Sequence, residues 1–95
     1  MSSNLADRIR IIRELETSGR AEFCHLTGIA KKTLVGIEQT GRTPRGDILE
    51  SICRIWPQYC LWLLTGHIGV EVTQISPQDE LERRNDALKQ GKASG

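Results

Sequence analysis

The segment from Leu26 to Pro44 reads LTGIAKKTLVGIEQTGRTP and places a glycine between two stretches of helical periodicity. Gly28 suits the left-handed conformation in which a helix ends and the chain turns sharply. After it, Ile29, Leu34 and Ile37 fall at spacings that point to one side of a helix. The segment therefore predicts two short helices that meet at a tight glycine turn.

Glycine and proline divide the rest of residues 5–66 in the same way. A stripe of apolar residues, Leu5, Ile9, Ile12 and Leu15, predicts a first helix that ends near Thr17. We expect four more helices, over residues 20–27, 30–39, 48–56 and 57–66. The side chains predicted to cap the first, second and fourth helices are those of Asn4, Ser18 and Asp47.

Beyond this all-α part, residues 67–75 show some alternation of apolar and polar positions, enough for an extended arm or an edge strand. Ser76 and Pro77 then predict a final helix to about Gln90, with residues 91–95 frayed. Its apolar content is thin, so we expect it to dock loosely or to meet a second chain. The predicted domains are a helical domain over residues 1–66 and an arm and helix over residues 67–95, a candidate dimerisation element.

Composition describes an ordinary globular chain of 95 residues, 38% hydrophobic and 26% charged. The sequence shows no membrane-spanning run and no secretory leader, so a cytoplasmic location is the default expectation. Cys24, Cys53 and Cys60 are odd in number and widely spaced, and with His25 and His67 they form no metal-ligand spacing. We expect three buried thiols, no disulfide, no metal and no cofactor.

Positive charge is concentrated in the part of the chain that holds the glycine turn. Residues 1–46 contain eight Lys or Arg against five Asp or Glu, whereas residues 47–75 contain one against three. This modest excess suggests local contacts with phosphate groups.

Two motifs carry a resemblance to a known family. IEQTGRTP, residues 37–44, is similar to the pattern that follows the recognition helix in lambda-repressor-like regulators of bacteria and phages, the xenobiotic-response-element or Cro/repressor type. WLLTG, residues 62–66, is similar to the usual ending of their domain. The resemblance covers about residues 5–66. It implies an all-α fold in which residues 1–66 are a five-helix lambda-repressor-like helix-turn-helix DNA-binding domain. An extended arm and a C-terminal helix follow this domain. The resemblance points to a prophage-encoded regulator.

The resemblance also implies roles for individual residues. The outward positions of the third helix, which read DNA bases in this family, are Lys31, Lys32, Val35 and Gly36. The residues expected to contact phosphates are Arg20, Thr33, Arg42, Thr43 and Arg45. Arg13 and Glu38 are expected to form a partly buried structural ion pair. The alternative for the two lysines is a solvated helix start, but two cations there oppose the helix dipole.

Three features depart from the family pattern. Ala30 stands where a Ser or Thr cap is usual. The missing side-chain acceptor costs the helix about 1 kcal/mol of stability. Gly36 costs the recognition helix about another 1 kcal/mol relative to Ala and brings no side chain to the bases. Thr40 replaces the usual loop glycine, with Gly41 one place later.

Two functional hypotheses follow. The first is a sequence-specific transcriptional regulator of phage-repressor type that binds double-stranded DNA as a homodimer. The second is a protein-interaction module or antitoxin-like partner that keeps the helical scaffold with weak or no DNA binding. We expect no enzyme, because no nucleophile, base and orienting group stand together in the sequence. We also expect no membrane partner and no small-molecule ligand.

Overall fold

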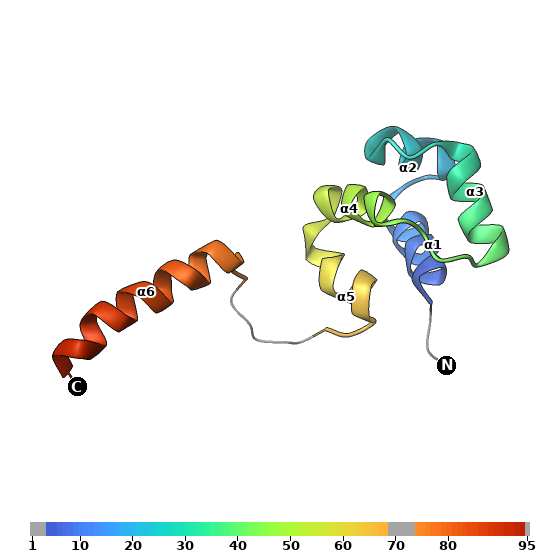
Figure 1. The fold of residues 1–95 in the computed structure, drawn as a ribbon. Helices are drawn as coiled ribbons and strands as arrows, with labels where there is room; N and C mark the ends of the chain where they lie inside the picture. Colours follow the sequence, from blue (N-terminus) through green and yellow to red (C-terminus); the bar gives the residue numbers. More distant parts are fainter. Residues whose placement is uncertain (1–3, 69–73, 95) are drawn as a thin grey trace.

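A computed structural model describes residues 4–68 and 74–94, and these residues are all-α, with no strand among them (Figure 1). Four helices and a short fifth follow one another closely, and a long helix completes the described chain. The elements are α1 Leu5–Glu16, α2 Arg20–Thr27, α3 Lys31–Thr40, α4 Gly46–Ile55, the 3-10 turn η1 Pro57–Tyr59, α5 Cys60–Thr65 and α6 Pro77–Ser94. Within these ranges no helix is both long enough and apolar enough to cross a membrane.

The core lies where α1 to α5 meet. Phe23 of α2 is fully buried and its ring stacks on that of Trp56, with centroids 5.6 Å apart and planes 13° apart. Aliphatic side chains from α1, α3, α4 and α5, with Ile29 of the turn before α3, complete one small hydrophobic cluster. Its members are Ala6, Ile9, Ile12, Ile29, Leu34, Ile37, Ile48, Ile52 and Leu63, together with Phe23 and Trp56.

Helix starts follow local rules in some places and not in others. The Asn4 side chain accepts the Asp7 N–H at 2.8 Å and caps α1 as predicted. The predicted caps of α2 and α4 are wrong, because Gly19 and Arg45 occupy those cap positions without a side-chain hydrogen bond. Ser18 lies before the cap of α2, and Asp47 lies inside the first turn of α4.

The apolar periodicity of α1 overstates its buried face. Leu15 continues the stripe of Ile9 and Ile12 in sequence, but it is 70% exposed because the core ends one turn earlier. Arg8 is buried instead, and its Nε donates to the carbonyl oxygen of Leu63 at 2.8 Å. The sequence pattern missed this bond, which joins the first and fifth helices.

The end of the body follows its prolines and glycines. Pro57 opens a 3-10 turn that leads into α5, so the predicted fifth helix is shorter and begins with a tighter turn. Gly66 closes α5 with φ of 78°. Tyr59 and Trp62 are half-buried and pack against the core from outside.

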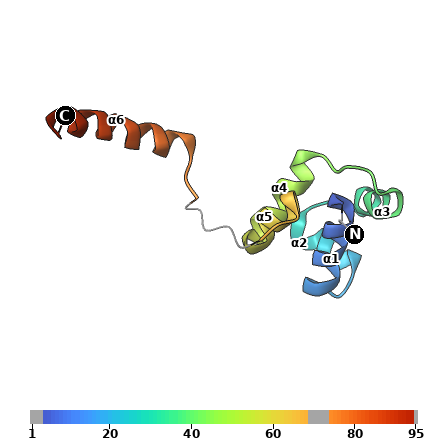
Figure 2. The ribbon, with the colours of Figure 1, turned by 90° about the horizontal axis from the view of Figure 1, so that it is seen from below.

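The last helix projects away from this body in both views (Figure 1, Figure 2), and the described structure measures 59 × 30 × 21 Å. Ser76 accepts the Asp79 N–H at 3.0 Å, as expected of an N-cap. The helix continues to Ser94, so the predicted end near Gln90 is wrong. Most of the arm predicted over residues 67–75 lies outside the described residues.

Candidate nucleic-acid interface

The turn between α2 and α3 is built around Gly28, which adopts φ of 78°. Its N–H donates to the carbonyl oxygen of Cys24 at 2.9 Å and ends α2. The hydroxyl of Thr27 donates to the Phe23 carbonyl and accepts the Ile29 N–H, at 2.8 and 3.3 Å. These bonds fix the turn that leads to Ala30, the cap residue of α3, which supplies no side-chain hydrogen bond of its own.

The outer face of α3 carries the predicted base-reading residues. Lys31 and Lys32 are exposed, and neither ammonium group has a hydrogen bond or ion pair within residues 4–68 and 74–94. Val35 and Gly36, on the following turn, are half-buried. Thr33, in the first turn, is also half-buried. Two free cations therefore stand at the exposed start of a helix whose other face, Leu34 and Ile37, is buried.

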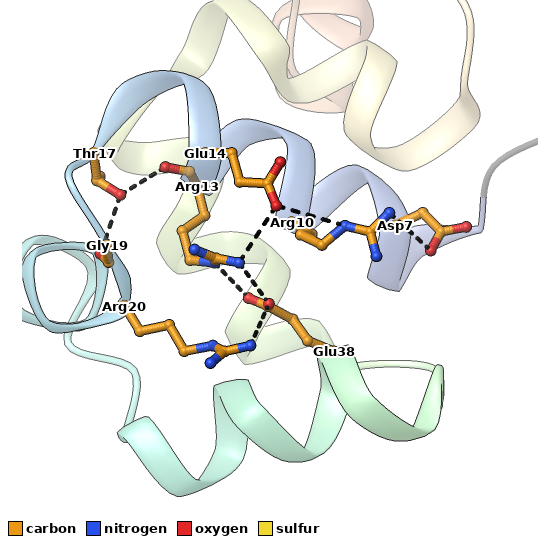
Figure 3. A network of polar contacts seen from close by, with 8 residues as sticks. All are labelled: Asp7, Arg10, Arg13, Glu14, Thr17, Gly19, Arg20 and Glu38. Carbon is orange, nitrogen blue, oxygen red and sulfur yellow. Dashed lines mark hydrogen bonds and ion pairs between the residues drawn. The ribbon is translucent and has the colours of Figure 1, made fainter.

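Behind this face, one carboxylate joins three helices (Figure 3). Glu38 of α3, only 3% exposed in its side chain, accepts from Arg13 Nε and Nη2 at 2.7 and 2.8 Å. The hydrogen bond that Arg13 donates to Glu38 is the main reason that the pKa of Arg13 is raised. The predicted ion pair between Arg13 and Glu38 is thus present.

Arg20 also turns toward Glu38. Its Nη2 lies 3.2 Å from Glu38 Oε1, and its side chain is 38% exposed (Figure 3). Sequence reasoning placed this guanidinium outward, on a phosphate. That contact stays a prediction, and it would require Arg20 to share its donors with Glu38 or to leave it.

The loop after α3 brings the remaining predicted phosphate ligands together. Arg45 is 80% exposed in its side chain and pairs loosely with Asp47 at 3.3 Å. Thr43 is exposed beside it. Arg42 differs from both, because its guanidinium folds back over α3 at Gly36.

A hollow of about 360 Å³ opens between α3, this loop and the start of α4. Four of its side chains, those of Thr33, Arg42, Thr43 and Arg45, were predicted as phosphate contacts. The full lining is Thr33, Ile37, Arg42, Thr43, Pro44, Arg45 and Ile48. The structure thus gathers these predicted residues at one surface next to the lysines.

The three cysteines are free thiols and are half-buried rather than fully buried. Burial raises the pKa of Cys24, and burial together with a side-chain hydrogen bond to Cys60 raises the pKa of Cys53 to about 12. Such thiols are protonated and poor nucleophiles at neutral pH. Among the described residues no group of His, Cys, Asp and Glu is arranged to hold a metal ion.

Comparison with known proteins places the chain. It is 32% identical over 79 residues to the protein named Repressor protein C of Escherichia phage P2, a match that spans 81% of this chain and 80% of that protein. The chain belongs to the phage-repressor family of helix-turn-helix proteins. No family model matches the chain. No solved structure matches it either.

Proposed function

We propose that this repressor-family chain is a DNA-binding transcriptional regulator that places α3 in the major groove. The observation that carries the proposal is the pair of exposed, unpartnered ammonium groups of Lys31 and Lys32 at the start of α3. A helix that follows a tight turn and presents cations from its first turn fits the major groove. The relationship to a phage repressor supports a regulatory rather than an enzymatic role.

The proposed domain comprises residues 1–66 with α1 to α5 in a lambda-repressor-like arrangement. Lys31, Lys32 and Val35 face the bases. Phosphate contacts are proposed for Arg20 before α3, Thr33 in its first turn, and Thr43 and Arg45 in the loop after it. Arg42, predicted with them, lies against α3 itself and differs from them for that reason.

We propose that the regulator is a homodimer. One recognition helix reads too few base pairs for useful selectivity, whereas two helices about 34 Å apart read two half-sites. Residues 67–95 are the proposed dimerisation element, because Leu81 and Leu88 of α6 are 59% and 65% exposed and lie two turns apart on one side of the helix. Leu61 and Leu64 of α5 are exposed as well, at 42% and 47%.

The second candidate function is a protein-interaction module on the same scaffold. The engagement of Arg20 with Glu38 favours it, because that pair withdraws a predicted phosphate ligand from the surface. The absence of a side-chain cap on α3 acts in the same direction, since it weakens the helix that must enter DNA.

Selection of bound sequences from a random duplex pool tests the proposal. A regulator enriches a palindrome, and its affinity for that duplex falls steeply as salt rises. Replacing Lys31 and Lys32 by Ala should abolish enrichment, whereas the matched removal of two exposed charges elsewhere in the body, Arg10→Ala with Arg54→Ala, should leave it intact. If the unaltered protein shifts no duplex even at low salt, the interaction module becomes the better account.

A further inference from the structure

The guanidinium of Arg42 stands where a side chain at residue 36 would stand. A Cβ added to Gly36 would lie 2.9 Å from Arg42 Nη2, 3.4 Å from Cζ and 3.9 Å from Nε. These distances place the flat guanidinium directly over the backbone of α3. The glycine that looked like a defect in the recognition helix is the space that admits this group.

The backbone around it is built to hold Arg42 there. The hydroxyl of Thr40 donates to the Gly36 carbonyl at 2.6 Å and accepts the Arg42 N–H at 3.3 Å. Gly41 adopts φ of 69° and its N–H donates to the Ile37 carbonyl at 2.9 Å. The chain therefore reverses at Gly41, and the residue after it returns along α3. Two of the departures from the family pattern therefore act together: Gly36, and the loop glycine that stands at residue 41 rather than 40. Both help to place the Arg42 guanidinium over α3.

The donors of Arg42 are free. Within residues 4–68 and 74–94, every other arginine has a hydrogen bond or an ion pair: Arg8 with the Leu63 carbonyl, and Arg10, Arg13, Arg20, Arg45, Arg54, Arg83 and Arg84 with carboxylates. Arg42 is exposed, and no hydrogen bond or ion pair of its guanidinium occurs in these residues. A guanidinium carries five N–H donors in a planar fork that suits two parallel acceptors.

Its place on the helix decides what those donors meet. Gly36 lies four residues after Lys32, one turn further along the same side of α3. The Arg42 guanidinium therefore extends the row of cations that begins with Lys31 and Lys32. A group lying on the groove-facing side of the helix meets base edges, whereas the sugar-phosphate backbone passes the flanking loop and helix ends.

We infer that Arg42 reads a base rather than a phosphate, and that it does so from the position vacated by the side chain of residue 36. The expected base is a guanine, whose O6 and N7 accept both arms of an arginine fork in the major groove. This inference rests on the proposed DNA binding and refines which residue determines specificity. It reassigns Arg42 from the phosphate contacts predicted from the sequence.

The test uses the duplex selected by the unaltered full chain and copies of it with each guanine replaced in turn. Affinities of Arg42→Ala, Gly36→Ala and the double variant are measured on every duplex and on an unrelated one, at several salt concentrations. Arg45→Ala is the matched control, since it removes one charge from the same loop. Thermal unfolding checks that each variant folds.

We expect Arg42→Ala to weaken the selected duplex by roughly 10- to 100-fold and to make one guanine replaceable without further loss. Gly36→Ala should reproduce this relaxed position at unchanged net charge, because its methyl group displaces only the end of a flexible side chain. In the Arg42→Ala background, Gly36→Ala should have no further effect on affinity. Arg45→Ala should weaken all duplexes by the same factor.

Three results would overturn the inference, and they can be told apart. If Arg42→Ala weakens every duplex equally and lowers the salt dependence by about one counterion, Arg42 is a phosphate contact and the proposed function stands. If Gly36→Ala leaves every affinity unchanged, the position over Gly36 is not where Arg42 acts. If the unaltered chain binds no duplex, the proposed function fails and this inference fails with it.

Discussion

Among the described residues, two carboxylates each accept hydrogen bonds from two arginines, one inside the five-helix body and one on α6. Glu38 is 3% exposed and joins Arg13 and Arg20, which come from two other helices. Glu80 is 23% exposed and pairs with Arg83 and Arg84 of its own helix, at 2.5 and 2.6 Å. The two clusters have the same composition but very different surroundings.

The difference shows what each part of the molecule depends on. The Glu38 cluster bridges residues 18 and 25 positions apart in sequence, so it exists only when α1, α2 and α3 are packed. The Glu80 cluster spans three and four positions, and one helical turn is enough to form it. The body is therefore stabilised by tertiary packing, whereas α6 is stabilised by local bonds along its length.

The largest expected effect contrasts the cores of the two regions. Phe23→Ala removes a fully buried ring and should lower the free energy of unfolding of the body by about 3 to 5 kcal/mol. Leu88→Ala on α6 removes a side chain that is 65% exposed and should change it by less than about 0.5 kcal/mol. Urea unfolding followed by the fluorescence of the two tryptophans, Trp56 and Trp62, both in contact with the core, measures both. Equal losses would mean that α6 is part of the same cooperative unit.

The second contrast removes the charge of each carboxylate. Glu38→Gln leaves two guanidiniums without their buried partner and should lower the free energy of unfolding by about 3 kcal/mol. Glu80→Gln makes the same chemical change at a half-buried site whose partners are on its own helix, and it should lower the free energy of unfolding far less. Calorimetric Tm values of the two variants provide the measurement. A small loss for Glu38→Gln would show that Arg13 and Arg20 find other partners or reach solvent.

The third contrast concerns helix caps. Asn4→Ala and Ser76→Ala each remove one side-chain acceptor and should weaken the capped helix by about 1 kcal/mol. Only Asn4→Ala should lower the Tm of the body, because α1 contributes to its core. Ser76→Ala should instead speed amide hydrogen exchange in α6 alone. Faster exchange throughout the body in Ser76→Ala would contradict the separation of the two regions.

The smallest expected effect is a pH dependence confined to α6. Hydrogen bonds from Arg83 and then Arg84 lower the pKa of Glu80 to about 2, whereas an unfolded Glu titrates near pH 4.3. The stabilisation is complete above about pH 4.3 and is lost as the pH falls toward 2. Residue-resolved NMR should show α6 losing order in this window, and Glu80→Gln should remove the dependence. A midpoint near 4.3 for Glu80 itself would show that the pairs do not form in solution.

The positions of helix ends were largely predictable, because they depend on one or two neighbouring residues. The left-handed glycines at 28, 41 and 66, the break at Pro57 and the caps at Asn4 and Ser76 follow from backbone geometry and local hydrogen bonding. Where the prediction was wrong, as for Ser18, Asp47 and the end of α6, several local solutions competed and the sequence did not rank them.

The orientation of the charged side chains was not predictable in the same way. Nothing in the first helix indicated that Arg8 is buried while Leu15 is exposed. The resemblance to repressors suggested the pair of Arg13 and Glu38, but only packing brought Arg20 to the same carboxylate.

The sequence by itself determined the order and approximate extent of the helices, which glycines turn the chain, and that two lysines begin the third helix. Only the tertiary structure decided that Arg20 turns inward and that Arg42 lies over Gly36. The physical reason is range: caps and turns are satisfied within four residues, whereas a long flexible guanidinium takes its place from whichever carboxylate or open backbone the packed helices bring within its reach.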